Sequence, residues 1–406
     1  MKPLLLLLVP LLFLPESFTM AQTPASPPPD QTAVAAGNNA FAVDLYGQLR
    51  KQDGNLFFSP ESISTAFAMA YAGARGSTAS QMAKTLHFTL PPDSLHPAMG
   101  ALLASLNAEH PGYQLYVADA LWAEKDFPFL DAYLKLTSSD YGAGFNRVDF
   151  KAAPEAARQT INQWVEQKTE NKIKDLIPPR AITPATRLVL TNAIYFKGDW
   201  ETKFDKAQTQ DEDFHLDAAQ TVKAPLMHIE SKFGYFSGGT FQALSIPYKT
   251  SELSLVVLLP NDTTGLPALE QSLTAANVKQ WLNQLNSVRK VILTLPKFKM
   301  TNQFELSNAL GSLGMTQAFQ PGNADFSGMT GKRDFWISSA IHKAFIDVNE
   351  EGTEAAAATA IVMRSNAAAR DQVPIVFRAD RPFVFLIRDN RSGAILFLGR
   401  VTNPTK

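Results

Sequence analysis

The sequence predicts a single large domain of the α+β class. Helix-like and strand-like patterns are mixed along the chain without the regular strand–helix alternation of parallel α/β folds. The chain has 406 residues and an apolar fraction of 45%, which is ample for a large core. Length alone would suggest two or more domains, but no stretch inside the body has the composition of a linker. We therefore expect one domain.

Composition excludes several classes of function. The formal net charge of −1 argues against a nucleic-acid or anionic-membrane partner, and the basic residues do not cluster into a heparin-like site. The absence of cysteine excludes disulfides, thiolate nucleophiles and thiolate metal sites. The histidines show no ligand pair at helical spacing, so we expect no metal and no cofactor; they are His87, His96, His110, His215, His228 and His342.

The N-terminus has the pattern of a signal peptide. Lys2 precedes an apolar run over residues 4–14 that is too short to span a bilayer. Thr19-Met20-Ala21 provides small residues for cleavage after Ala21, so residues 1–21 are expected to be removed. An uncleaved anchor and a true start at Met20 are the alternatives. Residues 22–32 are proline-rich and predict a flexible lead-in to a domain at 33–406, giving a secreted protein, extracellular or periplasmic.

The first third of the body predicts helices around one short strand. Residues 34–49 have the periodicity of an amphipathic helix. A short strand from Asn55 then leads into a second helix, with Ser59 as N-cap and Pro60 at the first helical position. Residues 66–71 are apolar on every side, so this helix should be buried. A turn at 73–76 ends it, and Ser77 caps the next helix.

The rest of the body predicts mainly strands. Residues 188–196 are a continuous apolar run typical of a buried strand, closed by residues 197–200. The other expected strands are 115–122, 241–248, 253–260, 291–296 and 336–349, with helices at 154–176 and 304–313. Two final strands, 383–387 and 394–401, form a hairpin through the turn sequence at 389–393.

An alanine-rich stretch follows the strand at 336–349. Alanine has the highest helix propensity, so an exposed helix is one interpretation of residues 350–360. The other is a strand, in which side chains alternate between two faces. One face then carries only small, uncharged residues: Thr353, Ala355, Ala357 and Thr359. Such a strand can enter between two existing strands without overpacking the core.

No enzyme motif is present. The sequence has no Gly-x-Ser-x-Gly, no His-Glu-x-x-His and no glycine-rich phosphate loop. We therefore do not expect an enzyme.

The stretch Glu350–Thr359 resembles the hinge of an inhibitory serpin, and Phe377–Ile387 resembles the C-terminal signature of that family. The resemblance spans about Val34 to Pro404. It also includes the segments Asn55–Ile63, Thr191–Trp200, Thr209–Asp217 with Val222–Met227, Leu295–Phe298 and His342–Ala344. It implies the serpin fold, with three β-sheets, about nine helices and an exposed reactive-centre loop at about residues 350–376.

The resemblance also implies three groups of functional residues. The hinge is Glu350, Glu351, Gly352, Thr353, Glu354, Ala355, Ala356, Ala357, Ala358 and Thr359. The shutter group, beneath the central sheet, is Ser59, Ser62, Asn192 and His342. The breach group, where the loop enters the sheet, is Trp200, Lys297 and Glu350. Without the resemblance, the shutter group would be an ordinary core network, and Lys297–Glu350 an exposed ion pair of little energetic value.

The function implied is that of a suicide-substrate inhibitor of serine endopeptidases, with cysteine proteases as a cross-class option. The target protease forms a covalent acyl-enzyme with the loop, which then inserts into the central sheet, as the family does. We expect a monomer that can form loop–sheet polymers. The alternative is a non-inhibitory carrier, storage or chaperone protein, but the small residues on the Thr353 face favour inhibition.

The scissile bond follows from the spacing of the family. Counting from Glu350 gives Asn366–Ala367 as the reactive bond. Arg364 and Met363 are the alternatives, because both lie within reach of the same position.

Overall fold

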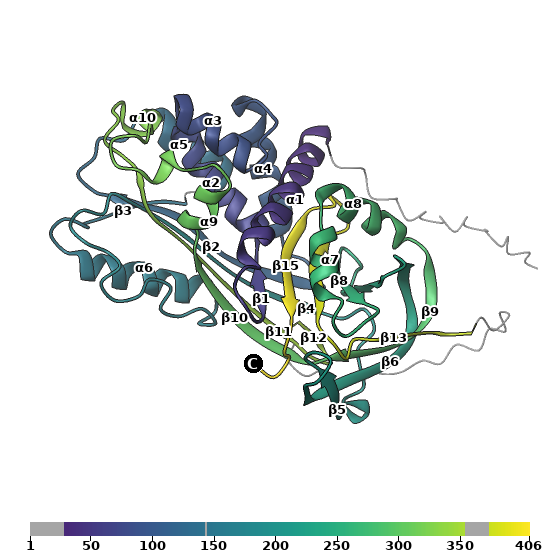
Figure 1. Ribbon diagram of the computed structural model, residues 1–406. Coiled ribbons are helices and arrows are strands. Elements are labelled where there is room, and N and C mark those ends of the chain that lie inside the picture. The colour runs from purple at the N-terminus through teal and green to yellow at the C-terminus, as the bar shows by residue number, and fades with distance from the viewer. Residues whose placement is uncertain (1–27, 143, 354–372) are drawn as a thin grey trace, which may run out of the picture.

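The computed structural model describes residues 28–142, 144–353 and 373–406, and it has the predicted α+β architecture. Figure 1 shows two β-sheets with helices gathered mainly at one end of the molecule. Among the described residues, none of the helices is long and apolar enough to cross a membrane. The expected signal peptide at 1–21 lies outside the described residues.

The smaller sheet has six strands. Their order is β10 (Phe298–Glu305), β11 (Ile337–Val348), β12 (Gly352–Thr353), β4 (Leu188–Asp199), β2 (Tyr113–Glu124) and β3 (Phe145–Val148). The long strands β4 and β11 are parallel and pair directly with each other along most of their length. The two-residue strand β12 lies between their ends. At the centre of this sheet, β4 and β11 are therefore hydrogen-bonded to each other along most of their length and are separated by β12 at one end.

The larger sheet has nine strands. Their order is β1 (Leu56–Phe58), β15 (Ile395–Val401), β14 (Phe383–Asp389), β8 (Leu253–Pro260), β7 (Phe241–Pro247), β6 (Thr221–Ser237), β9 (Val288–Pro296) and β13 (Ile375–Arg378), with β5 (Gln210–His215) attached to β6. The resemblance implied three sheets. Hydrogen bonding joins the described strands into two, because the 17-residue strand β6 pairs with β5 and β9 and then continues to β7.

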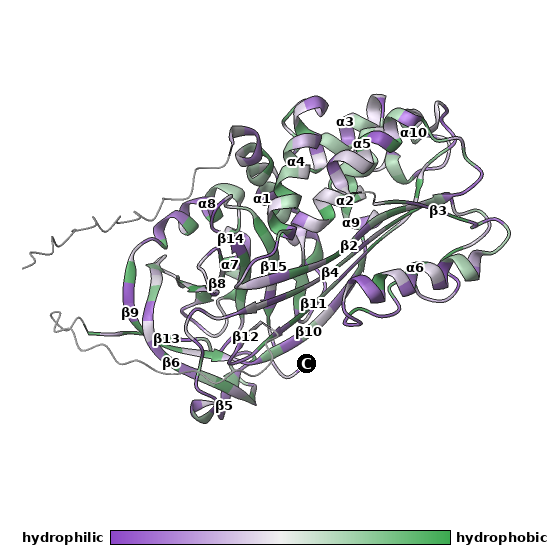
Figure 2. Ribbon diagram, turned by 180° about the vertical axis from the view of Figure 1, so that it is seen from behind, coloured by the Kyte–Doolittle hydropathy of each residue, from purple (hydrophilic) through white to green (hydrophobic). Residues whose placement is uncertain are grey.

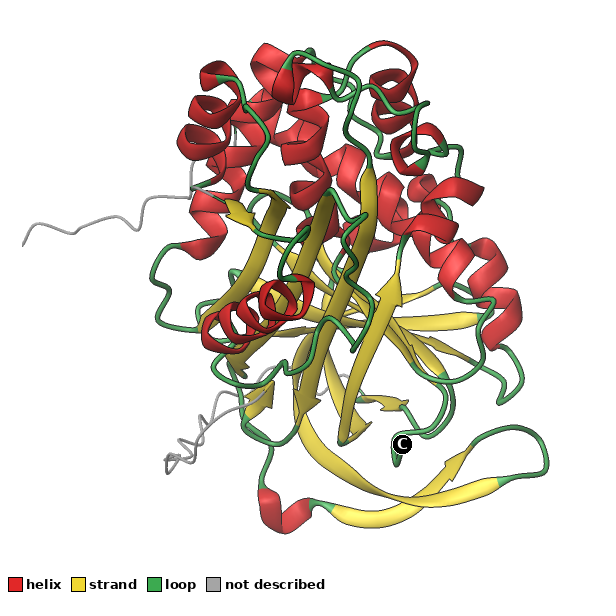
Figure 3. Ribbon diagram, turned by 90° about the vertical axis from the view of Figure 1, so that its left-hand side faces the viewer, coloured by secondary structure: helices red, strands yellow, loops and turns green. Residues whose placement is uncertain are grey.

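Ten α-helices occur in the described residues. They are α1 (Pro29–Leu49), α2 (Pro60–Gly73), α3 (Gly76–Thr85), α4 (Pro92–Asn107), α5 (Asp131–Tyr141), α6 (Pro154–Lys168), α7 (Leu266–Ser272), α8 (Ala275–Gln284), α9 (Ser307–Ser312) and α10 (Ser327–Thr330). Figure 3 shows α6 lying alone across the face of the smaller sheet, away from the main group of helices. Its hydrophilic residues are visible in Figure 2, while Ile161 and Val165 pack inward against the sheet.

Helix α2 confirms the prediction of a buried helix. Its side chains from Pro60 to Ala70 are all buried, between the two sheets and the neighbouring helices. The helix starts as the sequence predicts, because the Ser59 side chain accepts a hydrogen bond from the Ser62 amide at 3.2 Å and Pro60 occupies the first helical position. This start also fixes the position of Ser59 and Ser62 beneath the smaller sheet.

Several predicted boundaries were wrong. Helix α1 begins at Pro29, inside the stretch expected as a flexible lead-in. Helix α3 begins at Gly76 with Arg75 at the N-cap position, so Ser77 does not cap it. The helix expected at 304–313 is shorter, because Phe304 belongs to β10 and α9 begins only at Ser307.

The helix predicted at 154–176 ends at Lys168. The Thr169 hydroxyl donates to the Val165 carbonyl at 2.8 Å and also accepts from the Ile173 amide at 3.3 Å. Glu170 and Asn171 then adopt positive φ angles, which a helix does not allow. A threonine side chain that bonds to the backbone therefore stops a helix that apolar periodicity alone would continue.

Candidate functional site

The predicted hinge leads into the junction between β4 and β11, which we call the seam. The seam pairs the two strands directly from Leu188–Ile337 to Tyr195–Phe345. Beyond this point the strands separate, and β12 bonds to Gly198 and Asp199 on one side and to Val348 on the other. The seam is therefore closed in its middle and open at the end where the hinge begins.

The shutter group lies together in the closed middle of the seam. Asn192 of β4 and His342 of β11 are register partners, and their side chains are joined by a short hydrogen bond between Oδ1 and Nδ1. His342 Nε2 accepts from the Ser59 amide at 3.1 Å, and Asn192 Nδ2 donates to Ser62 Oγ at 2.6 Å. All four residues are buried. The network joins the two strands of the seam to the start of α2.

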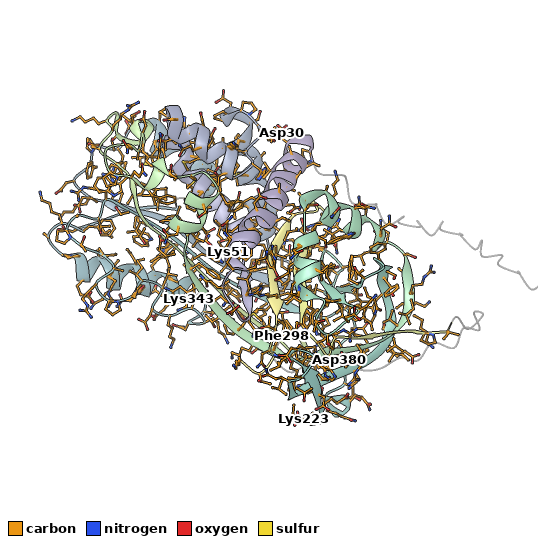
Figure 4. The ribbon with its side chains drawn as sticks, in the orientation of Figure 1. Asp30, Lys51, Lys223, Phe298, Lys343 and Asp380 are labelled. Carbon is orange, nitrogen blue, oxygen red and sulfur yellow. The ribbon has the colours of Figure 1, made fainter. Side chains whose placement is uncertain are left out.

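His342 is uncharged in this network. Burial lowers its pKa to about 3, so the ring stays neutral at physiological pH. Because Nε2 accepts from the Ser59 amide, the single ring proton lies on Nδ1 and is donated to Asn192. Figure 4 marks the next residue, Lys343, which points to the opposite side of β11 and donates to the Lys174 carbonyl at 2.7 Å.

Asp119 of β2 is a fifth member of the network that the sequence reasoning missed. Its carboxyl accepts from Asn192 Nδ2 at 2.6 Å and from Ser62 Oγ at 2.8 and 2.9 Å. Burial raises the pKa of Asp119 well above its ordinary value. The strand period could have revealed it, because Asp119 shares a face with the apolar residues Val117 and Leu121. An acid on an apolar face is unusual enough to indicate a polar network beneath the sheet.

The breach group lies together at the open end of the seam. Trp200 Nε1 donates to the Asn349 carbonyl at 2.8 Å, and the Trp200 amide donates to the Glu351 carbonyl at 3.0 Å. Lys297 Nζ lies 2.9 Å from one carboxylate oxygen of Glu350 and 3.1 Å from the other. Thr209 adds a hydrogen bond of 2.8 Å to Glu350. These contacts hold the start of the hinge against the body.

The alternative interpretation, in which Lys297 and Glu350 form an exposed ion pair, does not hold for the acid. The Glu350 side chain is 6% exposed, whereas that of Lys297 is 37% exposed. Burial alone would raise the pKa of Glu350, but hydrogen bonds from Lys297, from a backbone amide and from Thr209 outweigh it and hold the pKa below its ordinary value. The neighbouring Glu351 has its pKa lowered by hydrogen bonds from Lys203 and Lys206. Both carboxylates are therefore ionised at neutral pH.

The hinge has already entered the sheet at Thr353. This side chain is fully buried, and its hydroxyl lies 2.8 Å from that of Tyr248. Tyr248 in turn stacks on Trp200, with ring centroids 4.6 Å apart. At Gly352 an added Cβ would lie 2.0 Å from the Gly198 carbonyl oxygen, so only glycine fits this approach. The first residue with a side chain to enter the seam is thus in place before any cleavage.

The far side of the loop is held by the other sheet. Strand β13 pairs in parallel with β9. Arg378 bonds to Glu212 of β5, and its Nε donates to Asp380 at 2.8 Å. Figure 4 marks Asp380 beyond the end of β13. The described parts of the hinge and of the C-terminal signature are therefore fixed to different sheets.

The other expected site residues lie outside the described residues. They are Glu354, Ala355, Ala356, Ala357, Ala358 and Thr359 of the hinge, and Met363, Arg364, Asn366 and Ala367 around the reactive bond. Within the part of the chain that the structure describes, no group of three or more histidine, aspartate or glutamate side chains is arranged to hold a metal ion.

Comparison with known proteins agrees with the architecture. Residues 36–404 match the family model described as Serpin (serine protease inhibitor). The leukocyte elastase inhibitors of Equus caballus and Homo sapiens are each 42% identical to this chain, over 381 and 380 residues. Each alignment covers 91% of this chain and 99% of the relative. The crystal structure of human thyroxine-binding globulin in complex with thyroxine is 31% identical, with a TM-score of 0.82, and the match covers 93% of this chain and all of that one.

The prediction of a secreted or periplasmic protein was wrong. The relatives that match this chain over almost their whole length are named leukocyte elastase inhibitors and Serpin B6, and this group of relatives overturns the prediction. The prediction of export depended on a local pattern alone, namely an apolar run followed by small residues near the N-terminus.

The match covers nearly the whole chain, and relatives at 42% identity are named as inhibitors rather than as enzymes. The seam, the hinge at its open end and the polar network in its middle all lie inside the matched region. The chain belongs to the serpin family.

Proposed function

We propose that this protein is a suicide-substrate inhibitor of serine endopeptidases, and of cysteine proteases as a cross-class activity. The observation that carries the proposal is the position of Thr353. It is buried between the ends of β4 and β11, directly before a stretch of small residues. The names of the 42% identical relatives support the same activity.

The reaction begins with the protease. Its nucleophile attacks the carbonyl of the scissile bond, an acyl-enzyme forms, and the new amino end of the loop leaves on the β13 side. The other side is then free to extend β12 between β4 and β11. Main-chain hydrogen bonds and newly buried side chains favour this extension. The acyl-linked protease is carried along, and displacement of its reacting groups slows deacylation.

The position of β12 sets which side chains become buried. Thr353 faces Tyr248 in the core. A strand that continues from it with the period of two places Ala355, Ala357 and Thr359 on the same face. Glu354 falls on the opposite face, which α6 covers only in part, so its charge can reach water. The hinge sequence therefore suits insertion in the register that Thr353 already has.

Incubation with a panel of serine proteases tests the proposal. We expect a covalent complex that survives boiling in SDS with at least one of them, and intact-mass mapping of the released fragment then identifies the scissile bond. Arg364→Ala should abolish inhibition of trypsin-like proteases if Arg364 is recognised. It should leave inhibition intact if the bond is Asn366–Ala367. Free turnover of the loop by every protease that cuts it would refute the inhibitory assignment.

A carrier function is the second candidate. Human thyroxine-binding globulin, which has the same fold, was crystallised in complex with its hormone. A carrier would bind its ligand without a covalent complex. Formation of an SDS-stable complex therefore distinguishes an inhibitor from a carrier. Size-exclusion chromatography separately tests the expected monomer.

A further inference from the structure

A cavity of about 750 Å³ lies at the edge of the smaller sheet, between α2, α4, α5, β2 and α6. Strand β3 pairs with β2 only from Leu121 onward. The preceding part of β2, with Val117 and Asp119, therefore borders this hollow and not another strand. The volume is in the range of small-molecule sites, roughly 300–1,000 Å³.

The wall of the cavity is mixed in character. Apolar side chains from four elements line it, namely Met69, Leu103, Val117 and Trp164. Polar side chains also line it, including Asn107, Ser139 and Asn146. Such a wall suits a ligand with an apolar body and one polar group.

Asp119 is one of the residues that line this cavity. It packs beneath the sheet with Ser62 and Asn192, yet it keeps some accessible surface because the cavity reaches it. None of the ion pairs among the described residues includes Asp119. Asp140 of α5 and the exposed Lys168 of α6 also line the cavity. Glu61 of α2 lies near Asp119, but burial raises its pKa to about 7, so it adds little negative charge below that pH. A half-buried carboxyl that forms no ion pair among the described residues and lines a ligand-sized cavity is a candidate binding group.

We propose that this cavity binds a small organic cation, an amine with an apolar body, whose ammonium group contacts the Asp119 carboxylate. The apolar body lies against Val117, Leu103 and Trp164. Burial raises the pKa of Asp119, so the carboxyl of the empty site tends to hold its proton. Binding of a protonated amine ionises the carboxyl, and the proton leaves to the buffer.

The ligand also acts on the seam, and this part rests on the proposed inhibitory function. The Asp119 carboxyl accepts a hydrogen bond from Asn192 Nδ2. Asn192 Oδ1 in turn accepts a hydrogen bond from His342 Nδ1 across the seam. An ionised Asp119 accepts this hydrogen bond more strongly, because charge-assisted bonds are stronger. The occupied cavity therefore stabilises the closed seam and slows loop insertion.

Isothermal titration calorimetry with benzylamine tests binding on the protein alone. Benzyl alcohol is the neutral control and benzoate the anionic one. We expect benzylamine to bind and the two controls not to bind. At pH 6 the measured binding enthalpy should change with the ionisation enthalpy of the buffer, because the buffer takes up the released proton. The slope of this dependence should correspond to up to about one proton released per ligand bound. Equal binding of benzyl alcohol, or no binding of benzylamine, would overturn the proposal.

Three variants locate the site. Asp119→Asn should weaken benzylamine binding at least about tenfold and abolish the proton release. Asp140→Asn is the matched control, because it removes a carboxylate that lines the same cavity but is not bonded to Ser62 or Asn192, and it should change the affinity less than about twofold. Ala101→Phe, at an exposed lining position of α4, narrows the cavity without touching Asp119 and should also weaken binding. Ala101→Phe still tests the site if Asp119→Asn does not fold. Unchanged benzylamine affinity in both Asp119→Asn and Ala101→Phe would refute the site.

The effect on the seam has its own readout. Benzylamine should slow formation of the SDS-stable complex with an elastase-type protease in the wild type but not in Asp119→Asn. Absence of any covalent complex would refute the proposed function and leave the binding result standing. Binding with an unchanged rate of complex formation would refute only the coupling to the seam.

Discussion

The two parts of the seam are held by different chemistry. At the open end, the hinge is fixed by ionised groups, with Glu350 paired to Lys297 and Glu351 to Lys203 and Lys206. In the closed middle, one hydrogen bond joins His342 to Asn192 and another joins the Ser59 amide to His342, and these groups are buried and uncharged. Salt screens the partly exposed ion pairs but has little effect on the buried network.

This difference indicates how insertion proceeds. The open end already accommodates β12, so the first step requires no new opening there. The middle must lose the hydrogen bond between Asn192 and His342 before a strand can pass. We infer that the open end admits the loop and that the middle resists it. Substitutions at the two places should therefore have different effects.

The largest effect is expected from Thr353→Arg. The site is fully buried against Tyr248, so an arginine there buries a charge without a partner at a cost of several kcal/mol, or is expelled from the sheet. A barrier higher by about 2.7 kcal/mol slows insertion roughly a hundredfold, enough for deacylation to win. The variant should be cut as fast as the wild type but turned over as a substrate.

The stoichiometry of inhibition and the melting temperature of the cut protein measure this effect. Thr353→Ser keeps the hydroxyl for Tyr248 and should remain an inhibitor. Wild-type protein should melt far higher after cleavage than before it, and equal melting temperatures would rule out loop insertion.

The next effect is expected from His342→Ala. It leaves the Ser59 amide and the Asn192 oxygen buried without partners, at about 1–3 kcal/mol for each group. The weakened seam should also admit the loop of another molecule, because opened strands present unpaired edges. Size-exclusion chromatography after mild heating should reveal polymers. Lys343→Ala, on the opposite side of the same strand, is the control and should stay monomeric.

A third prediction concerns the pH dependence of stability, because Glu61 beneath the middle of the seam becomes charged as pH rises. Burial raises the pKa of Glu61 to about 7 from an ordinary 4.5, so its ionisation opposes folding. The folded state therefore loses stability as pH rises from 4.5 through 7. Glu61→Gln should be as stable as the wild type at pH 4.5 and more stable at pH 8, by at most about 3 kcal/mol. Urea unfolding at the two pH values measures this, and an equal difference at both would contradict the assignment.

The smallest effect is expected from Lys297→Ala at the open end. It removes one partner of the buried Glu350 carboxylate, while Thr209 and a backbone amide remain, so the loss should be about 1 kcal/mol. High salt should weaken the wild-type pair and reduce the difference between the two proteins. A difference that grows with salt would show that the pair does not hold the hinge electrostatically.

Much of the fold could be predicted from the sequence, because long apolar runs and helix caps are local signals. Ser59 and Pro60 placed the start of α2, and the apolar run at 188–196 placed most of β4. Phe304 was assigned to a helix because its strand neighbour β11 is distant in the chain. Asp119 was missed for a related reason, since its partners Ser62 and Asn192 lie 57 and 73 residues away. Local periodicity could have shown that Asp119 lies on an apolar face of its strand, but it could not have shown which distant residues bond to it.

The attachment of β12 and β13 to different sheets has a consequence for refolding. Any cut between Thr353 and Ile375 divides the chain into two polypeptides, the shorter of which carries β13, β14 and β15. Strands β14 and β15 lie inside the larger sheet, between β1 and β8, so the two pieces remain associated by hydrogen bonds and packing alone. The intact chain folds in a unimolecular reaction, whereas the cut protein must reassemble from two molecules. Recovery of the cut form from denaturant should therefore depend on protein concentration, and dilution should separate the fragments for good.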